Sequence, residues 1–193
     1  MNYYVLERQN DDSHPLLGWS DDDPTDAETI FARNEEFLST QPVRLRLGRP
    51  IPKHPQLVDY HVLPEPVISE KLAAVLAPML LHMVQLVRAV IPLDGIDHPY
   101  YLLHVRNRVE CLDMRRTKYD PRLDGGIAIL EKIVLDEDKL RRVPEANRLL
   151  FCPQEYETIW LAHESVKNAL EAVSPVGLRF FHVDDWGDTV SFR

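Results

Sequence analysis

The spacing of apolar residues divides the chain into short strands and a few helices. Val43 to Leu47 alternates apolar and basic side chains, as a strand with one buried face does. The same reasoning predicts further strands over residues 3–6, 84–91, 100–105, 108–113, 127–135 and 178–183. Helical spacing predicts helices over residues 25–38, 70–76 and 164–173, and residues 136–142 read as a charged turn or one short helix.

Two stretches, Ser69–Ile91 and Ser165–Val183, share a pattern in which an amphipathic helix leads into a hydrophobic strand. The pattern is typical of a weak internal repeat or of two ordinary strand–helix–strand units, and we favour the second. The expected fold is α+β, with a mixed or antiparallel sheet, a few packing helices and two strand–helix–strand units. Residues 1–42 are expected to form an acidic strand and loop or helix segment packed on a main α+β domain of residues 43–193.

Composition is that of an ordinary globular protein. Of 193 residues, 45% are apolar and 27% charged, which argues against disorder. Two cysteines, Cys111 and Cys152, cannot form a disulfide framework or a Cys-x-x-Cys zinc site, which favours a reducing compartment. The N-terminus lacks the pattern of a secretion signal, and Leu72–Ile91 is too interrupted by polar residues and proline to cross a bilayer. We expect a cytoplasmic protein.

Charge is unevenly distributed within a net of −9. Residues 1–36 hold ten acids and two bases, residues 37–150 fourteen acids and seventeen bases, and residues 151–193 seven acids and three bases. Acidic ends argue against a nucleic-acid-binding protein, which presents a clustered basic face. They suit a cationic protein partner, or they serve only to keep the surface solvated.

Catalytic motifs are absent from the sequence. There is no G-x-S-x-G elbow, no phosphate-binding P-loop and no H-E-x-x-H helix, because Lys167 stands where His163-Glu164 would need a second histidine. The histidines are scattered singly, and both cysteines read as small core residues. We expect no catalytic residue, no bound metal and no cofactor.

Two acidic segments each carry a tryptophan. One is Trp19 with Asp21, Asp22 and Asp23, and the other is Asp184-Asp185-Trp186-Gly187-Asp188. Oxygen ligands of this kind could hold a metal ion, a tryptophan among acids could anchor a protein partner, and either segment could be a plain surface turn. The pair fits partner binding better than hydrolysis.

Several local patterns together resemble one protein family. They are Asp59-Tyr60, Ile68-Ser69-Glu70-Lys71-Leu72, Tyr100-Tyr101-Leu102-Leu103, Cys111-Leu112-Asp113, Val134-Leu135-Asp136, Gly177-Leu178-Arg179-Phe180-Phe181 and the opening Tyr3-Tyr4-Val5-Leu6. Their order resembles the eleventh numbered immunity-protein family of bacterial polymorphic toxin systems, over residues 43 to 183. Two features depart from the family pattern: Ala162-His163-Glu164 precedes Ser165 before the second helix, and the acidic stretch from Asp11 to Glu28 is particular to this chain.

The resemblance implies a non-enzymatic protein that binds and neutralises a toxin from a neighbouring gene, typically an effector of type VI secretion. Nucleases present a basic cleft to phosphate, which would attract an acidic inhibitor. The resulting hypothesis is a one-to-one complex with a DNase toxin. The expected toxin-binding residues are Trp19, Asp21, Asp22, Asp23, Asp184, Asp185, Trp186 and Asp188, with the two tryptophans as apolar anchors.

Two alternatives stay open. One is a metal-dependent hydrolase that uses His182, Asp184 and Asp185. The other is a scaffold or adaptor protein that binds no toxin.

Overall fold

A computed structural model describes residues 1–123 and 125–188 and confirms the α+β fold with mixed sheets. The six-stranded sheet has the order β2-β3-β6-β7-β5-β4. Its strands are Leu17–Trp19 (β2), Val43–Leu47 (β3), Val84–Leu93 (β6), Ile96–Val105 (β7), Val67–Ser69 (β5) and Tyr60–His61 (β4). All its pairs are antiparallel except the short parallel contact between β3 and β6.

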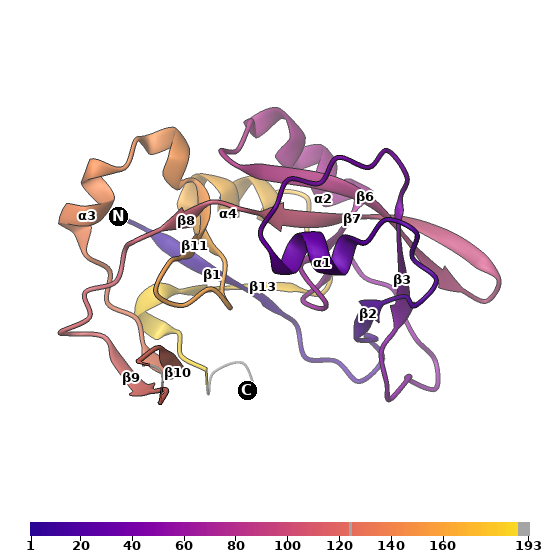
Figure 1. Cartoon of the computed structure of the whole chain (residues 1–193), viewed down its shortest axis with the longest axis horizontal. Coiled ribbons are helices and arrows are strands. Elements are labelled where there is room, and N and C mark those ends of the chain that lie inside the picture. Colours follow the sequence, from indigo (N-terminus) through magenta and orange to yellow (C-terminus); the bar gives the residue numbers. More distant parts are fainter. Residues whose placement is uncertain (124, 189–193) are drawn as a thin grey trace.

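The five-stranded sheet has the order β13-β1-β12-β11-β8. Its strands are Leu178–His182 (β13), Tyr3–Arg8 (β1), Leu161–His163 (β12), Leu150–Pro153 (β11) and Arg108–Val109 (β8). β8 follows β7 after two residues and pairs in parallel with β11, so one run of chain joins the two sheets (Figure 1). A separate hairpin pairs Lys118–Pro121 (β9) with Ile127–Lys132 (β10).

Four short α-helices accompany the strands of the described chain. They are Ala27–Ala32 (α1), Glu70–Leu76 (α2), Glu137–Arg142 (α3) and Glu164–Glu171 (α4), with 3₁₀ turns at Ala77–Met79 (η1), Glu145–Arg148 (η2) and Val183–Asp185 (η3). α2 and α4 contact each other, whereas α3 lies at one end of the molecule near the N-terminus (Figure 1). In the described residues, no helix has both the length and the hydropathy needed to cross a membrane.

Three predicted elements are at least three residues shorter in the structure than the sequence predicts. The helix predicted over 25–38 is only α1, because Asn34 turns into the left-handed region (φ 54°) and the chain then runs extended. The strand predicted over 108–113 stops at Val109, because the Glu155 carboxylate accepts the N–H groups of Cys111 and Leu112. The strand predicted over 127–135 ends at Lys132.

Both strand–helix–strand units are confirmed, and they have the same topology. The first runs β4-β5-α2-β6 and is completed by β7, and the second runs β11-β12-α4-β13 and is completed by β1. In the first, β7 lies between β6 and β5, and in the second, β1 lies between β13 and β12, with antiparallel pairs throughout. This arrangement is an internal repeat, the interpretation that the sequence analysis did not favour.

The register of the two central strands makes the repeat specific. The residue before each helix lies opposite the first tyrosine of a Tyr-Tyr pair, Ser69 opposite Tyr100 and His163 opposite Tyr3. Tyr100-Tyr101-Leu102-Leu103 therefore occupies in the first unit the place that Tyr3-Tyr4-Val5-Leu6 occupies in the second. Residues 1–42 contribute β1 to the five-stranded sheet and β2 to the six-stranded sheet.

Apolar side chains form three clusters around these sheets. One cluster joins the two units through α2 and α4, and its buried members include Leu72, Val166 and Leu6. A second lies under β2, β3 and α1, and a third packs β9, β10, α3 and the end of the chain on the five-stranded sheet. An open cleft lies beside this third cluster and shares Leu135, Leu140 and Val183 with it.

Candidate acidic cleft

A cleft of about 580 Å³ is lined by residues of the N-terminus, α3 and the turn after β13. Figure 1 shows α3 and the N-terminus at one end of the molecule. Four chain segments separated in sequence form its walls. The lining residues are Met1, Asp113, Arg116, Val134, Leu135, Asp136, Glu137, Asp138, Leu140, His182, Val183 and Asp184.

One rim of the cleft is built from two of the motifs that carry the family resemblance. Leu112 and Leu135 form an isolated antiparallel bridge, and the flanking Asp113 N–H donates to the Val134 carbonyl oxygen at 2.8 Å. The Asp136 N–H donates in turn to the Cys111 carbonyl oxygen at 2.8 Å. The bridge therefore places two carboxylates, from residues 23 positions apart, on the same rim.

Asp136 also fixes the start of α3. Its Oδ1 accepts the N–H groups of Asp138 and Lys139 at 3.0 and 3.1 Å, as an N-cap aspartate does. The following residues, Glu137 and Asp138, are exposed and pair with Arg141 on the outer side of the helix at 2.7 and 3.0 Å. The cap thus holds three consecutive acids at the cleft.

Carboxylates outnumber cations in the lining. The lining holds five carboxylates, Asp113, Asp136, Glu137, Asp138 and Asp184, and two basic groups, the Arg116 side chain and the N-terminal amine. Arg141, which is not a lining residue, pairs with Glu137 and Asp138. His182 Nδ1 lies 3.5 Å from Asp184 Oδ2, and the amine lies 3.8 Å from Glu137 Oε1. The Asp138 and Asp184 side chains are 79% and 74% exposed, so a basic partner can reach both, although Asp138 also pairs with Arg141.

The C-terminal acidic segment divides between surface and core. Asp184 and Asp185 are exposed, as partner contacts would be. Trp186 is 3% exposed, packs in the core and donates from Nε1 to Glu7 Oε1 at 2.8 Å. The prediction that Trp186 is an exposed anchor is therefore wrong for this conformation.

Asp188 is likewise engaged within the fold. Its carboxylate accepts the Leu130 N–H at 2.6 Å and the Tyr156 hydroxyl at 3.0 Å, which attaches the segment after β13 to β10. Gly187 makes this approach possible, because a Cβ there would overlap the Glu131 carbonyl oxygen. The predicted toxin-binding role of Asp188 thus falls on a residue with a structural role.

The N-terminal acidic segment lies over a different core cluster. Trp19 is half-buried and packs edge-on against Phe31, with ring centroids 5.4 Å apart. Asp21 and Asp22 are exposed, whereas Asp23 Oδ1 accepts the Arg44 N–H at 2.8 Å. Of these four predicted residues, only Asp21 and Asp22 present side chains mainly to solvent.

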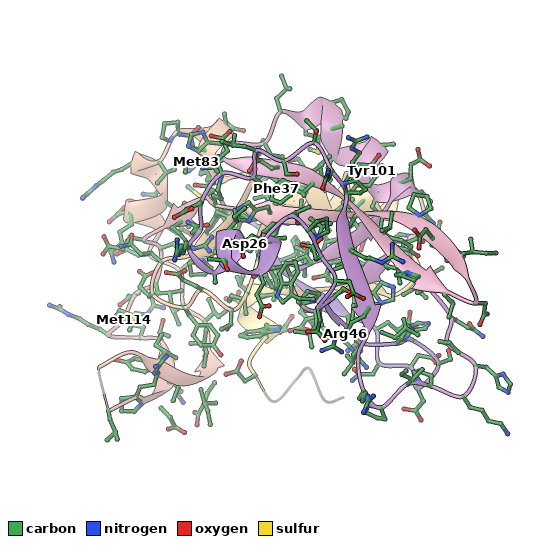
Figure 2. All side chains as sticks on the ribbon, turned by 45° about the vertical axis from the view of Figure 1, so that its right-hand side comes forward. Asp26, Phe37, Arg46, Met83, Tyr101 and Met114 are labelled. Carbon is green, nitrogen blue, oxygen red and sulfur yellow. The ribbon has the colours of Figure 1, made fainter. Side chains whose placement is uncertain are left out.

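The structure does not bring the two acidic segments together. Trp19 belongs with the cluster of α1 and β3, and Trp186 with that of β9, β10 and α3. Figure 2 shows Asp26, which follows the first segment, over the middle of the molecule, and Met114, next to the cleft residue Asp113, at one end. Asp184 instead lines the same cleft as Asp113 and the acids at the start of α3.

Sequence reasoning missed four of the five cleft carboxylates. Asp136, Glu137 and Asp138 were visible as a run of acids but were interpreted as a charged turn or short helix. Asp113 and Asp136 stood out only as parts of the resemblance motifs, and the bridge between Leu112 and Leu135 is what places them together. Their convergence is a property of the tertiary fold.

Both cysteine thiols are buried, and the described residues hold no grouped metal ligands. Cys111 and Cys152 are buried, and burial raises the pKa of the Cys152 thiol to about 12, where the reactive thiolate is scarce at neutral pH. Burial likewise raises the pKa of Cys111. Across residues 1–123 and 125–188, no three His, Cys, Asp or Glu side chains are grouped as metal ligands would be.

Comparison with known proteins adds no family. No protein-family model matches the chain, and no curated protein matches it either. The fold defines a class only: an α+β protein with two mixed sheets, an internal repeat and an acidic cleft at one end.

Proposed function

We propose that this chain is an immunity protein that neutralises a basic toxin of the nuclease type by direct binding, without catalysis. The observation that carries the proposal is the cleft, whose lining holds five carboxylates from three segments and only two basic groups, Arg116 and the N-terminal amine. Such a surface complements a basic cleft that binds phosphate. In this proposal the protein acts in the cytoplasm of the cell that makes the toxin, and the toxin is an effector delivered to other cells by type VI secretion.

The resemblance motifs support the same proposal. Two of the motifs that resemble the immunity family pair with each other, Cys111-Leu112-Asp113 and Val134-Leu135-Asp136. Their leucines form the backbone bridge, and their aspartates supply two of the cleft carboxylates that a basic partner would meet. Asp21 and Asp22 are exposed on a separate surface and are not among the residues that line the cleft.

Co-expression with the product of the adjacent gene tests the proposal. We expect the chain to rescue cells from that toxin and to be recovered with it as a one-to-one complex. Absence of rescue together with absence of a complex contradicts the proposal.

Charge reversal identifies the surface used. Asp138→Lys combined with Asp184→Lys should weaken toxin binding at least tenfold in calorimetry, because both carboxylates line the cleft. The matched control, Asp21→Lys with Asp22→Lys, changes the net charge equally on a different surface and should retain most of the affinity. Equal losses in the two variants would mean that net charge, not the cleft, determines binding.

A further inference from the structure

The outer side of β13 is an unpaired strand edge. Leu6 N–H donates to the Trp160 carbonyl oxygen, so alternate residues of β1 direct their backbone groups towards β12 or towards β13. In the antiparallel register, Val5 and Glu7 then bond to Phe181 and Arg179. The intervening residues of β13 direct their N–H and C=O groups away from the sheet.

Those outward groups belong to Phe180 and His182. β13 is the terminal strand of its sheet, and among the described residues no backbone hydrogen bond ends on the outward side of these two residues. A row of free donors and acceptors at alternate residues is complementary to one shape of ligand, an extended chain.

The internal repeat supports the same ligand shape. β6 is the equivalent of β13 in the first unit, and on its outer side it pairs with β3, with Val43 opposite Ala89 and Arg44 opposite Val90. The fold therefore accepts an added strand beside this element. In the second unit, no described strand occupies the corresponding place.

Aromatic and cationic side chains flank the edge on both faces. Phe180 and Phe181 are half-exposed and, as neighbours in a strand, point to opposite faces. Arg179 lies over the Phe181 ring at 5.0 Å, and Lys167 Nζ lies 6.0 Å from the Phe180 ring centroid. Apolar side chains on each face of an added strand would cover these rings.

The edge leads directly into the acidic cleft. His182 ends β13, and His182, Val183 and Asp184 are all cleft-lining residues. A chain that runs beside Phe180 therefore reaches the carboxylates of Asp184 and α3 within a few residues. A lysine or arginine at that point meets an excess of negative charge.

We propose that the outer edge of β13 binds an extended segment of the partner as an added strand, with apolar residues beside Phe180 and Phe181 and a lysine or arginine in the acidic cleft. The proposal deepens the proposed function and rests on it for the identity of the partner, the toxin. The chemistry of the bound segment follows from the edge and the cleft alone.

Amide hydrogen exchange on the free chain and with short probe peptides tests the site. The probes are hexapeptides of alternating valine and threonine with one lysine at either terminus, and matched peptides with glutamate in its place. We expect the Phe180 and His182 amides to exchange freely in the free protein and at least tenfold more slowly with a lysine peptide. The glutamate peptides should bind at least tenfold more weakly. Unchanged exchange at both amides with every peptide overturns the proposal.

Two substitutions separate the backbone contact from the side chain in binding to the toxin. Phe180→Pro removes an outward N–H at an edge position where proline is tolerated, and Phe180→Ala keeps that N–H. We expect Phe180→Pro to weaken binding at least tenfold and Phe180→Ala about threefold. If Phe180→Pro does not fold, amide hydrogen exchange at His182 in the wild-type toxin complex replaces it. Slower exchange in the complex supports the added strand, and unchanged exchange refutes it.

The two proposals fail differently. A toxin complex whose formation leaves Phe180 and His182 unprotected refutes the strand site but retains the immunity function. Protection by lysine peptides without toxin rescue retains the strand site and refutes the immunity function.

Discussion

Glu65 lies between β4 and β5 as a largely buried carboxyl group near the Arg108 guanidinium. Burial raises the pKa of Glu65 from 4.5 to about 7, and Arg108 offsets only part of this effect. The folded protein therefore holds this proton to a higher pH than the unfolded chain. The contribution of Glu65 to stability is present below pH 4.5 and is lost as the pH rises to about 7.

Glu65→Gln should remove this dependence. At pH 8 the variant should be more stable than the wild type by about 2 kcal/mol, and at pH 5 the two should be nearly equal. Urea unfolding of both proteins at pH 5, 6, 7 and 8 measures their difference in free energy of unfolding. Other titrating groups, such as His61, are present in both proteins, so the difference reports on Glu65. Glu157→Gln is the control, because Glu157 also pairs with Arg108 but is 56% exposed. A constant difference between Glu65→Gln and wild type across these pH values would refute the assignment.

Asp59 joins the two repeat units at a single carboxylate. It accepts the Ser69 hydroxyl at 2.7 Å and the Val176 N–H at 2.8 Å, and it pairs with Lys71. Burial raises the pKa of Asp59, but the hydrogen bonds from Lys71, Val176 and Ser69 outweigh it and lower the pKa. Its carboxylate form therefore stabilises the fold above its ordinary pKa, and this contribution is lost as the pH falls below it.

Asp59→Asn should reduce the free energy of unfolding by about 2 kcal/mol at pH 7, because charged hydrogen bonds are replaced by weaker ones. Asp97→Asn is the matched control: Asp97 pairs with Arg44 but is 50% exposed, so its loss should cost less than about 0.5 kcal/mol. Chemical denaturation of both variants gives the comparison. Similar losses in the two variants would show that Asp59 has no special role as a junction.

At the scale of elements, the segment after β13 is attached by the buried Trp186, by the close approach at Gly187 and by the Asp188 carboxylate. Asp188 accepts hydrogen bonds from Leu130 and Tyr156, whereas Asp185, three residues earlier, is exposed. The same acidic run therefore contains a structural residue and a surface residue. Sequence alone gives them equal status.

Asp188→Ala should destabilise the protein by about 1–3 kcal/mol, since the Leu130 N–H loses its partner. Asp185→Ala should change stability by less than about 0.5 kcal/mol. Thermal unfolding followed by circular dichroism measures both. The assignment is refuted if Asp185→Ala is the more destabilising of the two.

Element prediction succeeded where the pattern was local. The alternation of Val43 to Leu47 and the helix after Ser69 appear in the structure as β3 and α2. Prediction failed where a distant group decided the outcome, as when Glu155 satisfies the N–H groups of Cys111 and Leu112. A contact between residues more than 40 positions apart leaves no trace in hydrophobic periodicity.

At the scale of the whole molecule, the proposed complex depends on long-range charge. We predict that the association rate with the toxin falls at least tenfold between 20 mM and 500 mM salt, because salt screens the attraction between an acidic surface and a basic one. The dissociation rate should change much less. Stopped-flow kinetics over this range measures both rates, and a salt-independent association rate contradicts charge steering.

The sequence by itself determined the α+β class, the two strand–helix–strand units and the acidic character of both ends, because these follow from local periodicity, capping and composition. It also contained the two Tyr-Tyr strands, Tyr3-Tyr4 and Tyr100-Tyr101, without revealing that they are equivalent. Only the tertiary structure decided that Trp186 is core, that the two acidic segments lie apart and that Asp184 faces Asp113 and α3. Burial and proximity depend on which distant strands pair, and strand pairing is set by packing of the whole chain rather than by any local run of residues.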